Sequence, residues 1–136
     1  MTDDADRAST IDAHHHFWRY DAAEYGWIDD SMSALRRDFL PSDLAVTLKA
    51  AGVQQAISVQ ARQTIEETRW LLSMASTHEF IAGVVGWVPL ASPSVRAELA
   101  TLVASGKLRG VRHVVQGEAD PRFLERADFN AGIDAL

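Results

Sequence analysis

Short apolar runs alternate with longer amphipathic stretches along the whole chain after its first ten residues. Four of the runs have the length and composition of β-strands, and they cover residues 10–17, 53–61, 80–88 and 108–115. The last three are nearly continuous in apolar residues, a pattern typical of parallel strands whose faces are covered by helices. The chain therefore predicts a buried parallel sheet.

Helix signals lie between these strands. Pro41 suits the first turn of a helix, and Gly52 suits the position just after its end. Residues 64–67 form a capping-box pattern that opens a second helix. Residues 92–93, a serine and a proline, predict the start of a third helix, which Gly106 ends. Two further helical pieces are expected over 121–126 and 130–136.

Strands that alternate with helices imply βαβ units with right-handed crossovers. The unit recurs at Val53, Phe80 and Leu108. This spacing is typical of a (β/α)8 TIM barrel, which needs about 200 residues or more. We therefore expect an α/β fold in which residues 10–136 form the N-terminal half of such a barrel, truncated at its C-terminus, after a disordered tail over 1–9. A complete small four-stranded α/β domain is the alternative.

One segment, residues 19–39, shows no period. It mixes aromatic residues such as Trp27 with charged ones. A loop this long in a small domain is usually a lid or a binding loop. The alternative is a surface loop whose aromatic side chains serve only packing.

Composition excludes several classes of protein. The 136 residues carry a formal net charge of −6, which argues against nucleic acid or an anionic membrane as the partner. No apolar run has the length of a membrane helix, and the N-terminus lacks a secretory signal pattern. The chain has no cysteine, which fits a cytoplasmic protein and leaves only His, Asp and Glu as metal ligands.

Candidate metal chemistry lies in the first strand. Successive side chains on a strand point to opposite faces, so His14 and His16 share a face and His15 points away. Two such imidazoles can reach one cation, at about 2.0–2.1 Å per bond for zinc. Asp12 lies on the same face. Alternatively, the cluster is solvated, hydrogen-bonded, or left from a purification tag.

Polar residues also end the later strands, where a barrel places its active site. Gln60 and Arg62 follow the second strand, and Arg112 and His113 end the fourth. The bulky pair Ile57 and Val59 suits packing against helices, so Gln60 is expected to face the barrel interior.

Each of these residues also has a simpler interpretation. Gln60 could satisfy backbone groups, Arg62 could be a solvated charge, Arg112 could pair with a carboxylate, and His113 could be a packing residue. The choice between Arg112 and His113 stays open, because they point to opposite faces of a regular strand. Glu66 and Glu67 are interpreted as charges that favour a helix start. No partner is predicted for His15 or His78.

Six segments together resemble the amidohydrolase superfamily, and more closely its sugar-lactonase branch. They read IDAHHHFW, YGWIDDSM, LRRDFLPSDL, VQARQTIEETRWLL, FIAGVVGWVPL and LRGVRHVVQ, and the likeness spans residues 11–136. His15 departs from the branch, whose members commonly have glutamine at that position.

The resemblance implies hydrolysis of a small-molecule lactone by the full-length protein, assisted by a divalent metal ion, with zinc first. It implies His14 and His16 as metal ligands, Arg112 and His113 as catalytic residues, and Trp27, Gln60 and Arg62 as substrate-binding residues. Further ligands and an aspartate base would come from later strands. Alternatives are a lactonase that works without metal, an inactive half-barrel that self-associates as a homo-oligomer, and a small α/β binding domain.

Overall fold

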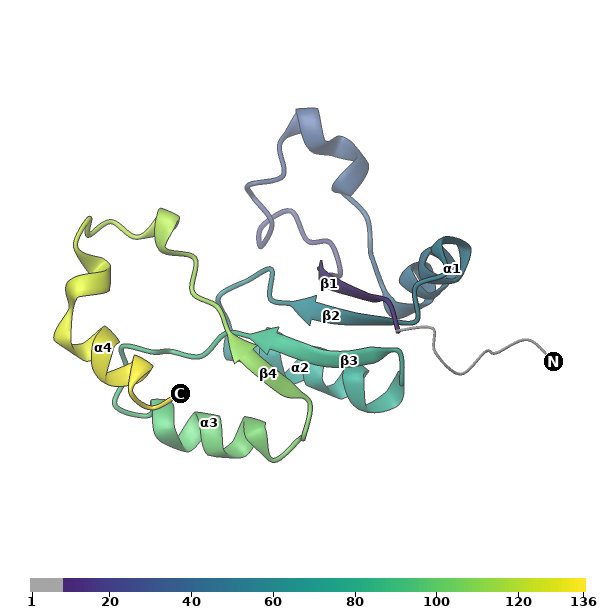
Figure 1. Cartoon of the computed structure of the whole chain (residues 1–136). Helices are drawn as coiled ribbons and strands as arrows, with labels where there is room; N and C mark the ends of the chain where they lie inside the picture. Colours follow the sequence, from purple (N-terminus) through teal and green to yellow (C-terminus); the bar gives the residue numbers. More distant parts are fainter. Residues whose placement is uncertain (1–8) are drawn as a thin grey trace.

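The computed structural model describes residues 9–136, which form one parallel sheet with helices packed on it (Figure 1). The strands are β1 (Ile11–His15), β2 (Gln55–Val59), β3 (Ile81–Gly86) and β4 (Leu108–Val111). The helices are α1 (Pro41–Ala51), α2 (Ile65–Thr77), α3 (Val95–Val103) and α4 (Ala127–Ile133). Short 3-10 helices lie at Asp30–Leu35, Val115–Gly117 and Phe123–Glu125. None of the helices in residues 9–136 has the length and apolar character needed to cross a membrane.

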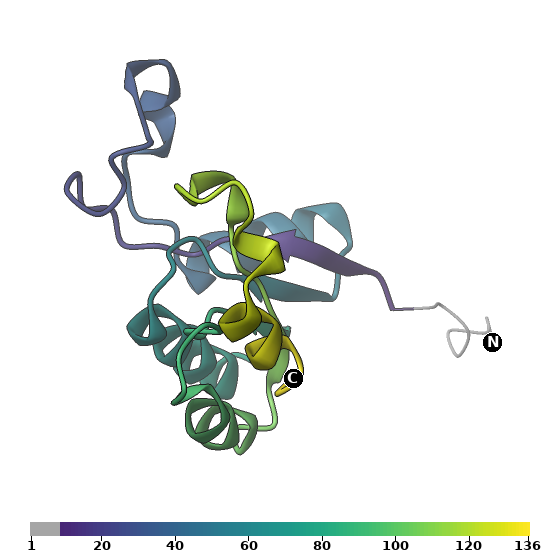
Figure 2. The same cartoon turned by 90° about the vertical axis from the view of Figure 1, so that its left-hand side faces the viewer.

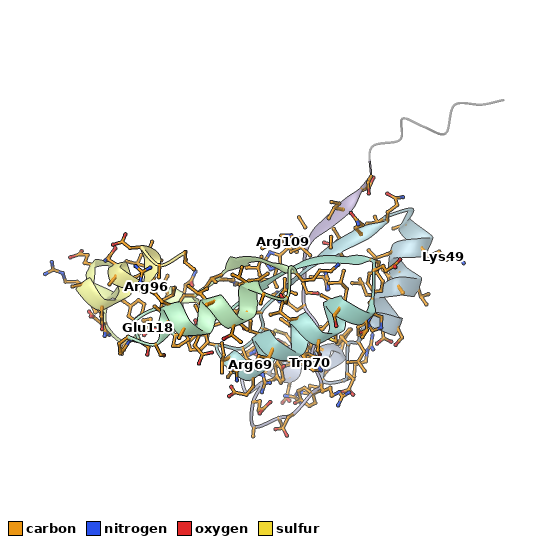
Figure 3. The ribbon with its side chains drawn as sticks, turned by 90° about the horizontal axis from the view of Figure 1, so that it is seen from below. Lys49, Arg69, Trp70, Arg96, Arg109 and Glu118 are labelled. Atoms are coloured by element: carbon orange, nitrogen blue, oxygen red, sulfur yellow. The ribbon has the colours of Figure 1, made fainter. Side chains whose placement is uncertain are left out.

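The strand order is β1-β2-β3-β4, and every neighbouring pair is parallel. The carboxyl ends of all four strands therefore meet at the same edge, where the arrowheads lie in Figure 1. Helices α2 and α3 lie side by side on one face, bridged by an ion pair of 3.0 Å between Arg69 and Glu98 (Figure 3). The predicted alternation of strands and helices around a parallel sheet is confirmed.

The sheet contains an irregularity in β1. Asp12 pairs with Ala56, whereas His15 pairs with Ser58, so β1 has one residue more than β2 between the two pairs. Such a bulge bends the strand and re-aims the side chains beyond it. The side chain of Asp12 accepts a hydrogen bond from the backbone N–H of His14 at 3.0 Å, which supports the bent segment.

The core lies between the sheet and the helices, and it corrects one prediction about β2. Ser58 is in register with Val84, two residues before Gly86, and that face is covered by Thr68 of α2. Ser58 is fully buried. The expectation that Ile57 and Val59 face the helices is therefore wrong. Ser58 lies on the helix side, where its hydroxyl is 3.0 Å from Nε2 of His15.

Residues 19–39 form a structured excursion with a small core of its own. Backbone hydrogen bonds of 3.1 and 2.9 Å between Trp18 and Phe39 hold its two ends together. Trp18, Tyr25 and Ile28 are buried within it. Figure 2 shows most of the excursion projecting beyond the sheet, whereas Glu24 and Tyr25 border a cavity together with Trp70 of α2. The aromatic residues serve packing, with the exception of Trp27, which is 52% exposed.

Several element bounds differ from the predictions. Helix α3 begins at Val95 rather than after Ser92, because the Ser92 hydroxyl accepts the N–H of Ser94 at 3.2 Å in a turn before the helix. The fourth strand ends at Val111, four residues early. The two C-terminal pieces are a 3-10 turn and α4, the latter starting three residues before the expected position. The sequence predicts a disordered tail over residues 1–9. Residues 1–8 of this stretch lie outside the described residues.

The contact of α4 with the chain after β3 gives a stability prediction. A Cβ at Gly132 would overlap the carbonyl oxygen of Leu90, so the backbone at one of the two positions would have to shift. Gly132→Ala is expected to lower the free energy of unfolding by about 1–3 kcal/mol. This is opposite in sign to the usual gain of alanine over glycine inside a helix.

Urea unfolding of the variant checks this prediction. Gly26→Ala is the matched control, because a Cβ at Gly26 meets no atom within 4 Å. A Gly132→Ala protein that is more stable than the parent would show that α4 does not sit against Leu90.

Candidate functional site

A cavity of about 520 Å³ opens at the carboxyl ends of the strands. Four residues singled out from the sequence line it: His16, Trp27, Gln60 and Arg112. They come from the end of β1, the 19–39 excursion, the end of β2 and the end of β4. The cavity is completed by Trp18, Ala61, Val114 and Gly117. The sheet thus brings together residues that are far apart in the sequence.

The histidine pair lies at one side of this cavity. The rings of His14 and His16 meet edge to face with their centroids 4.9 Å apart, as expected for side chains on one face of β1. Nδ1 of His16 lies 3.0 Å from the carbonyl oxygen of Val59. A carbonyl only accepts, so Nδ1 carries the proton and Nε2 keeps a free lone pair. Burial lowers the pKa of His16, and the nearby His14 and Arg112 add to this effect.

His15 points to the helix side of the sheet, as predicted, and there it has a partner that the sequence did not reveal. Its Nε2 lies 3.0 Å from the Ser58 hydroxyl, and its ring contacts Phe17 edge to face at 4.4 Å. Burial lowers the pKa of His15 to about 4. His78 also has a partner, the carbonyl oxygen of Met74 at 3.0 Å from its Nδ1.

Gln60 is fully buried at the floor of the cavity. Its Nε2 donates to the carbonyl oxygen of Arg112 at 3.4 Å, while its Oε1 has no partner among the described residues. A buried carbonyl oxygen without a donor costs stability, so this position is retained at a cost to the fold. Gln60 faces the interior as predicted, although β2 has ended at Val59 and the strand period no longer applies.

Arg112 faces the cavity from the residue that follows β4. Its backbone N–H donates to the carbonyl oxygen of Gly86 at 2.9 Å, which keeps this residue beside the end of β3. The two neighbouring side chains lie on opposite faces of the sheet, and Arg112 is the one that faces the cavity.

Three of the predicted site residues are not part of the cavity lining: His14, whose ring contacts that of His16, and also Arg62 and His113. The Arg62 guanidinium pairs with the carboxylate of Glu24 and lies 5.7 Å from the centre of the Tyr25 ring, in a separate cavity of about 230 Å³. His113 lies on the helix side, within hydrogen-bonding distance of Trp87 and Glu118. The structure therefore does not bring Arg62 and His113 together with the other candidates.

Glu67 is a residue of this region whose role the sequence did not predict. It is 1% exposed, and its carboxylate accepts the backbone N–H groups of Arg62 at 2.8 Å and Ala61 at 3.1 Å. Thr64 caps α2 through the N–H of Glu67 at 3.2 Å, so half of the predicted capping box is present. In place of the second capping-box hydrogen bond, the Glu67 carboxylate binds the backbone of the loop that follows Gln60. We call this contact the Glu67 brace. Burial raises the pKa of Glu67, and the two N–H donors oppose this effect.

The described residues do not form a complete metal site. No group of three or more His, Asp or Glu side chains in residues 9–136 could hold an ion. His16 fits as a nitrogen ligand, because it presents its free Nε2 while its Nδ1 is held by a carbonyl group, and the ring of His14 lies beside it. Any further ligands would have to come from outside these residues.

Comparison with known proteins gives consistent matches. The protein-family model described as Amidohydrolase matches residues 11–136. Two curated relatives, both named L-fucono-1,5-lactonase, come from Burkholderia multivorans and Burkholderia ambifaria and are 45% and 40% identical to this chain. Each match covers 93% of this chain and 43% of the relative. The chain therefore spans less than half the length of these relatives.

A solved structure of an amidohydrolase from Burkholderia multivorans with bound zinc is also similar. Its TM-score is 0.83 at 45% identity, over 93% of this chain and 44% of that chain. The four-stranded sheet with its helices is thus one half of an amidohydrolase barrel, as the sequence predicts.

Proposed function

The chain belongs to the amidohydrolase family, and from this premise we propose that the full-length protein hydrolyses the ring ester of a sugar lactone with the help of a divalent metal ion. The observation that carries the proposal is the cavity that gathers His16, Gln60 and Arg112 at the carboxyl edge of the sheet. The two relatives named L-fucono-1,5-lactonase support the choice of substrate class.

The residues of this chain have distinct roles in the proposed reaction. Arg112 donates hydrogen bonds to the carbonyl oxygen of the lactone as negative charge develops on it, which is where fixed donors contribute most to the rate. Gln60 lines the cavity wall beside Arg112 and holds the Arg112 backbone through its Nε2 donor to that carbonyl oxygen. Trp27, with its ring edge-on to Trp18 at 6.3 Å, covers the apolar face of the sugar ring.

His14 and His16 would hold the metal ion together with ligands from outside the described residues. When bound, such an ion supplies Lewis-acid activation of the lactone carbonyl or of water. Zinc is the first choice because two imidazole nitrogens suit it, and the similar structure from Burkholderia multivorans contains zinc.

A lactonase that needs no metal is the second candidate. It is favoured by one observation: the positive charge of Arg112 lines the same cavity as His16 and so offers an electrophile that belongs to the chain itself. Two measurements on the active protein separate the candidates: its zinc content, and its turnover after treatment with a chelator. A lactonase that needs no metal would keep its turnover after this treatment.

The proposal is tested by the hydrolysis of L-fucono-1,5-lactone by the full-length protein, followed through release of acid. Arg112→Met is expected to lower kcat by about 10²–10³-fold, the usual effect of removing one oxyanion donor. Arg109→Met is the matched control, because Arg109 lies on β4, three residues before Arg112, and outside the cavity lining.

Two results would contradict the proposal. A parent protein that leaves sugar lactones intact would exclude the substrate class. An Arg112→Met variant as active as the Arg109→Met control would exclude Arg112 as the oxyanion donor. Comparison with δ-valerolactone, which lacks ring hydroxyls, shows how far the sugar hydroxyls contribute.

A further inference from the structure

The geometry points to His113 as a positioning residue that holds the turn after β4 against the substrate cavity, through Trp87 on one side and Glu118 on the other. The inference rests on the proposed function, because the turn matters only if the cavity binds substrate. It assigns to His113 a role that needs no contact with the substrate.

Both ring nitrogens of His113 are engaged. The indole Nε1–H of Trp87 donates to Nδ1 of His113 at 3.2 Å, and an indole nitrogen is a donor only. The proton of the neutral imidazole therefore sits on Nε2, which lies 2.6 Å from a carboxylate oxygen of Glu118. With both nitrogens occupied and a side chain only 11% exposed, His113 has no nitrogen left for a reacting group.

The ring is also held by packing. It stacks on Phe123 with centroids 4.9 Å apart and an angle of 17° between the planes, and it meets Phe129 edge to face at 5.8 Å. Both phenylalanines belong to the core beneath α3 and α4. These contacts fix the ring of His113 against the core, and its hydrogen bond to Glu118 in turn restrains the position of that side chain.

Trp87, the other partner, is fixed as well. Its backbone N–H donates to the hydroxyl of Thr68 at 2.8 Å, and that hydroxyl lies 2.8 Å from the carbonyl oxygen of Trp87. Thr68 is fully buried in α2. A continuous line of hydrogen bonds therefore runs from α2 across the end of β3 to the end of β4.

The segment held in this way forms one wall of the cavity. Glu118 follows the 3-10 turn Val115–Gly117 directly, and Val114 and Gly117 both line the cavity beside Arg112. The backbone N–H of Val114 donates to the side-chain oxygen of Gln63 at 2.6 Å. The turn is therefore tied at its start by Gln63 and at its end by Glu118. Release of the second tie would let the wall and the adjacent Arg112 move.

The test uses substitutions that separate hydrogen bonding from packing in the full-length protein. His113→Phe keeps an aromatic ring on Phe123 but removes both hydrogen bonds, and it is expected to lower kcat/KM by about 10- to 100-fold, the usual effect of losing such a support. His113→Gln, which can still donate to Glu118, is expected to recover part of the activity. His78→Phe is the matched control, because it also removes a histidine hydrogen bond, the one to the Met74 carbonyl oxygen at the end of α2, but leaves Trp87, Glu118 and the turn untouched.

A double-mutant cycle identifies the path of the effect. Glu118→Ala is expected to have the same effect as His113→Phe, and the double variant is expected to lose no more than either single one. Additive losses would overturn the inference, because they would mean that the two residues act separately. Full kcat/KM in His113→Phe would overturn it as well.

Hydrogen exchange of the backbone provides a readout without substrate. In His113→Phe, exchange is expected to accelerate in residues 112–118 while β2 and β3 keep the protection of the parent. Equal acceleration in all strands would indicate general destabilisation and would overturn the inference. If the parent protein hydrolyses no lactone, the proposed function fails, and the exchange experiment still decides whether His113 holds the turn.

Discussion

Replacement of both His14 and His16 by alanine is expected to remove bound zinc from the full-length protein and to lower its turnover of sugar lactones by about 10²–10³-fold. The two rings meet edge to face with centroids 4.9 Å apart, and His16 lines the cavity. Elemental analysis of the purified variant and its kcat, measured on the same sample, check this result.

His78→Ala is the control for the histidine pair. It removes an imidazole from the C-terminal end of α2, outside the cavity, and it should retain both zinc and turnover. If the double variant kept its turnover but lost its zinc, the metal would be bound without taking part in the reaction. Undiminished zinc content would remove His14 and His16 from the ligand set.

Glu67→Ala is expected to lower the free energy of unfolding by about 2–4 kcal/mol, because it leaves two N–H groups of the loop after β2 without an acceptor and removes a buried side chain. Urea unfolding of the parent and the variant measures the difference. Glu66→Ala is the matched control: Glu66 is the exposed neighbour in the same helical turn, and its loss should cost about 0.5 kcal/mol or less. Equal losses at the two positions would mean that the brace does not stabilise the fold.

The pH dependence of the same brace can be measured with Glu67→Gln. Burial raises the pKa of Glu67 in the folded protein above its value in the unfolded chain. The folded state therefore holds this proton more tightly. The stability contributed by its protonation is fully present below the unfolded pKa and is lost as pH rises through the folded pKa. The stability of the parent relative to Glu67→Gln should accordingly be greater at pH 4 than at pH 8. An opposite trend would mean that the N–H donors outweigh burial.

The arrangement of strands and helices could be predicted because its signals are local. Thr64 caps α2 as expected, and the glycines at positions 52 and 106 have φ values of 68° and 67°, the left-handed backbone that ends a helix or its final turn. The alternation of such signals with apolar runs determines a parallel α/β sheet without knowledge of any contact between distant residues.

The direction of side chains near strand ends could not be predicted in the same way. The period of two holds only while a strand lasts, and β2 ends at Val59 and β4 at Val111. The orientation of Gln60, and which of Arg112 and His113 faces the cavity, depend on the backbone beyond those points. The placement of Arg62 depends on Glu24, which belongs to an excursion that has no periodic pattern.

Glu67 shows a different limit. The sequence contains a capping-box pattern, and this pattern correctly predicts the start of α2. However, the carboxylate extends past the helix to Ala61 and Arg62, because the loop after β2 turns back over the helix end. The capping-box pattern explained Glu67 by its own helix, so the pattern provided no reason to expect its contact with Ala61 and Arg62.

The strand order also has a kinetic consequence. Ala56 pairs with Ile81 and Val84 with Leu108, whereas the pairing of Ile11 with Gln55 closes a loop nearly twice as long. Each doubling of a loop adds about 0.6 kcal/mol of closure entropy, so β1 joins the sheet against a larger entropic barrier than β2, β3 or β4. The strand that carries the histidine pair is thus the one whose docking is slowest by this measure. The cavity wall from β2 to β4 can form before the side that would hold the metal.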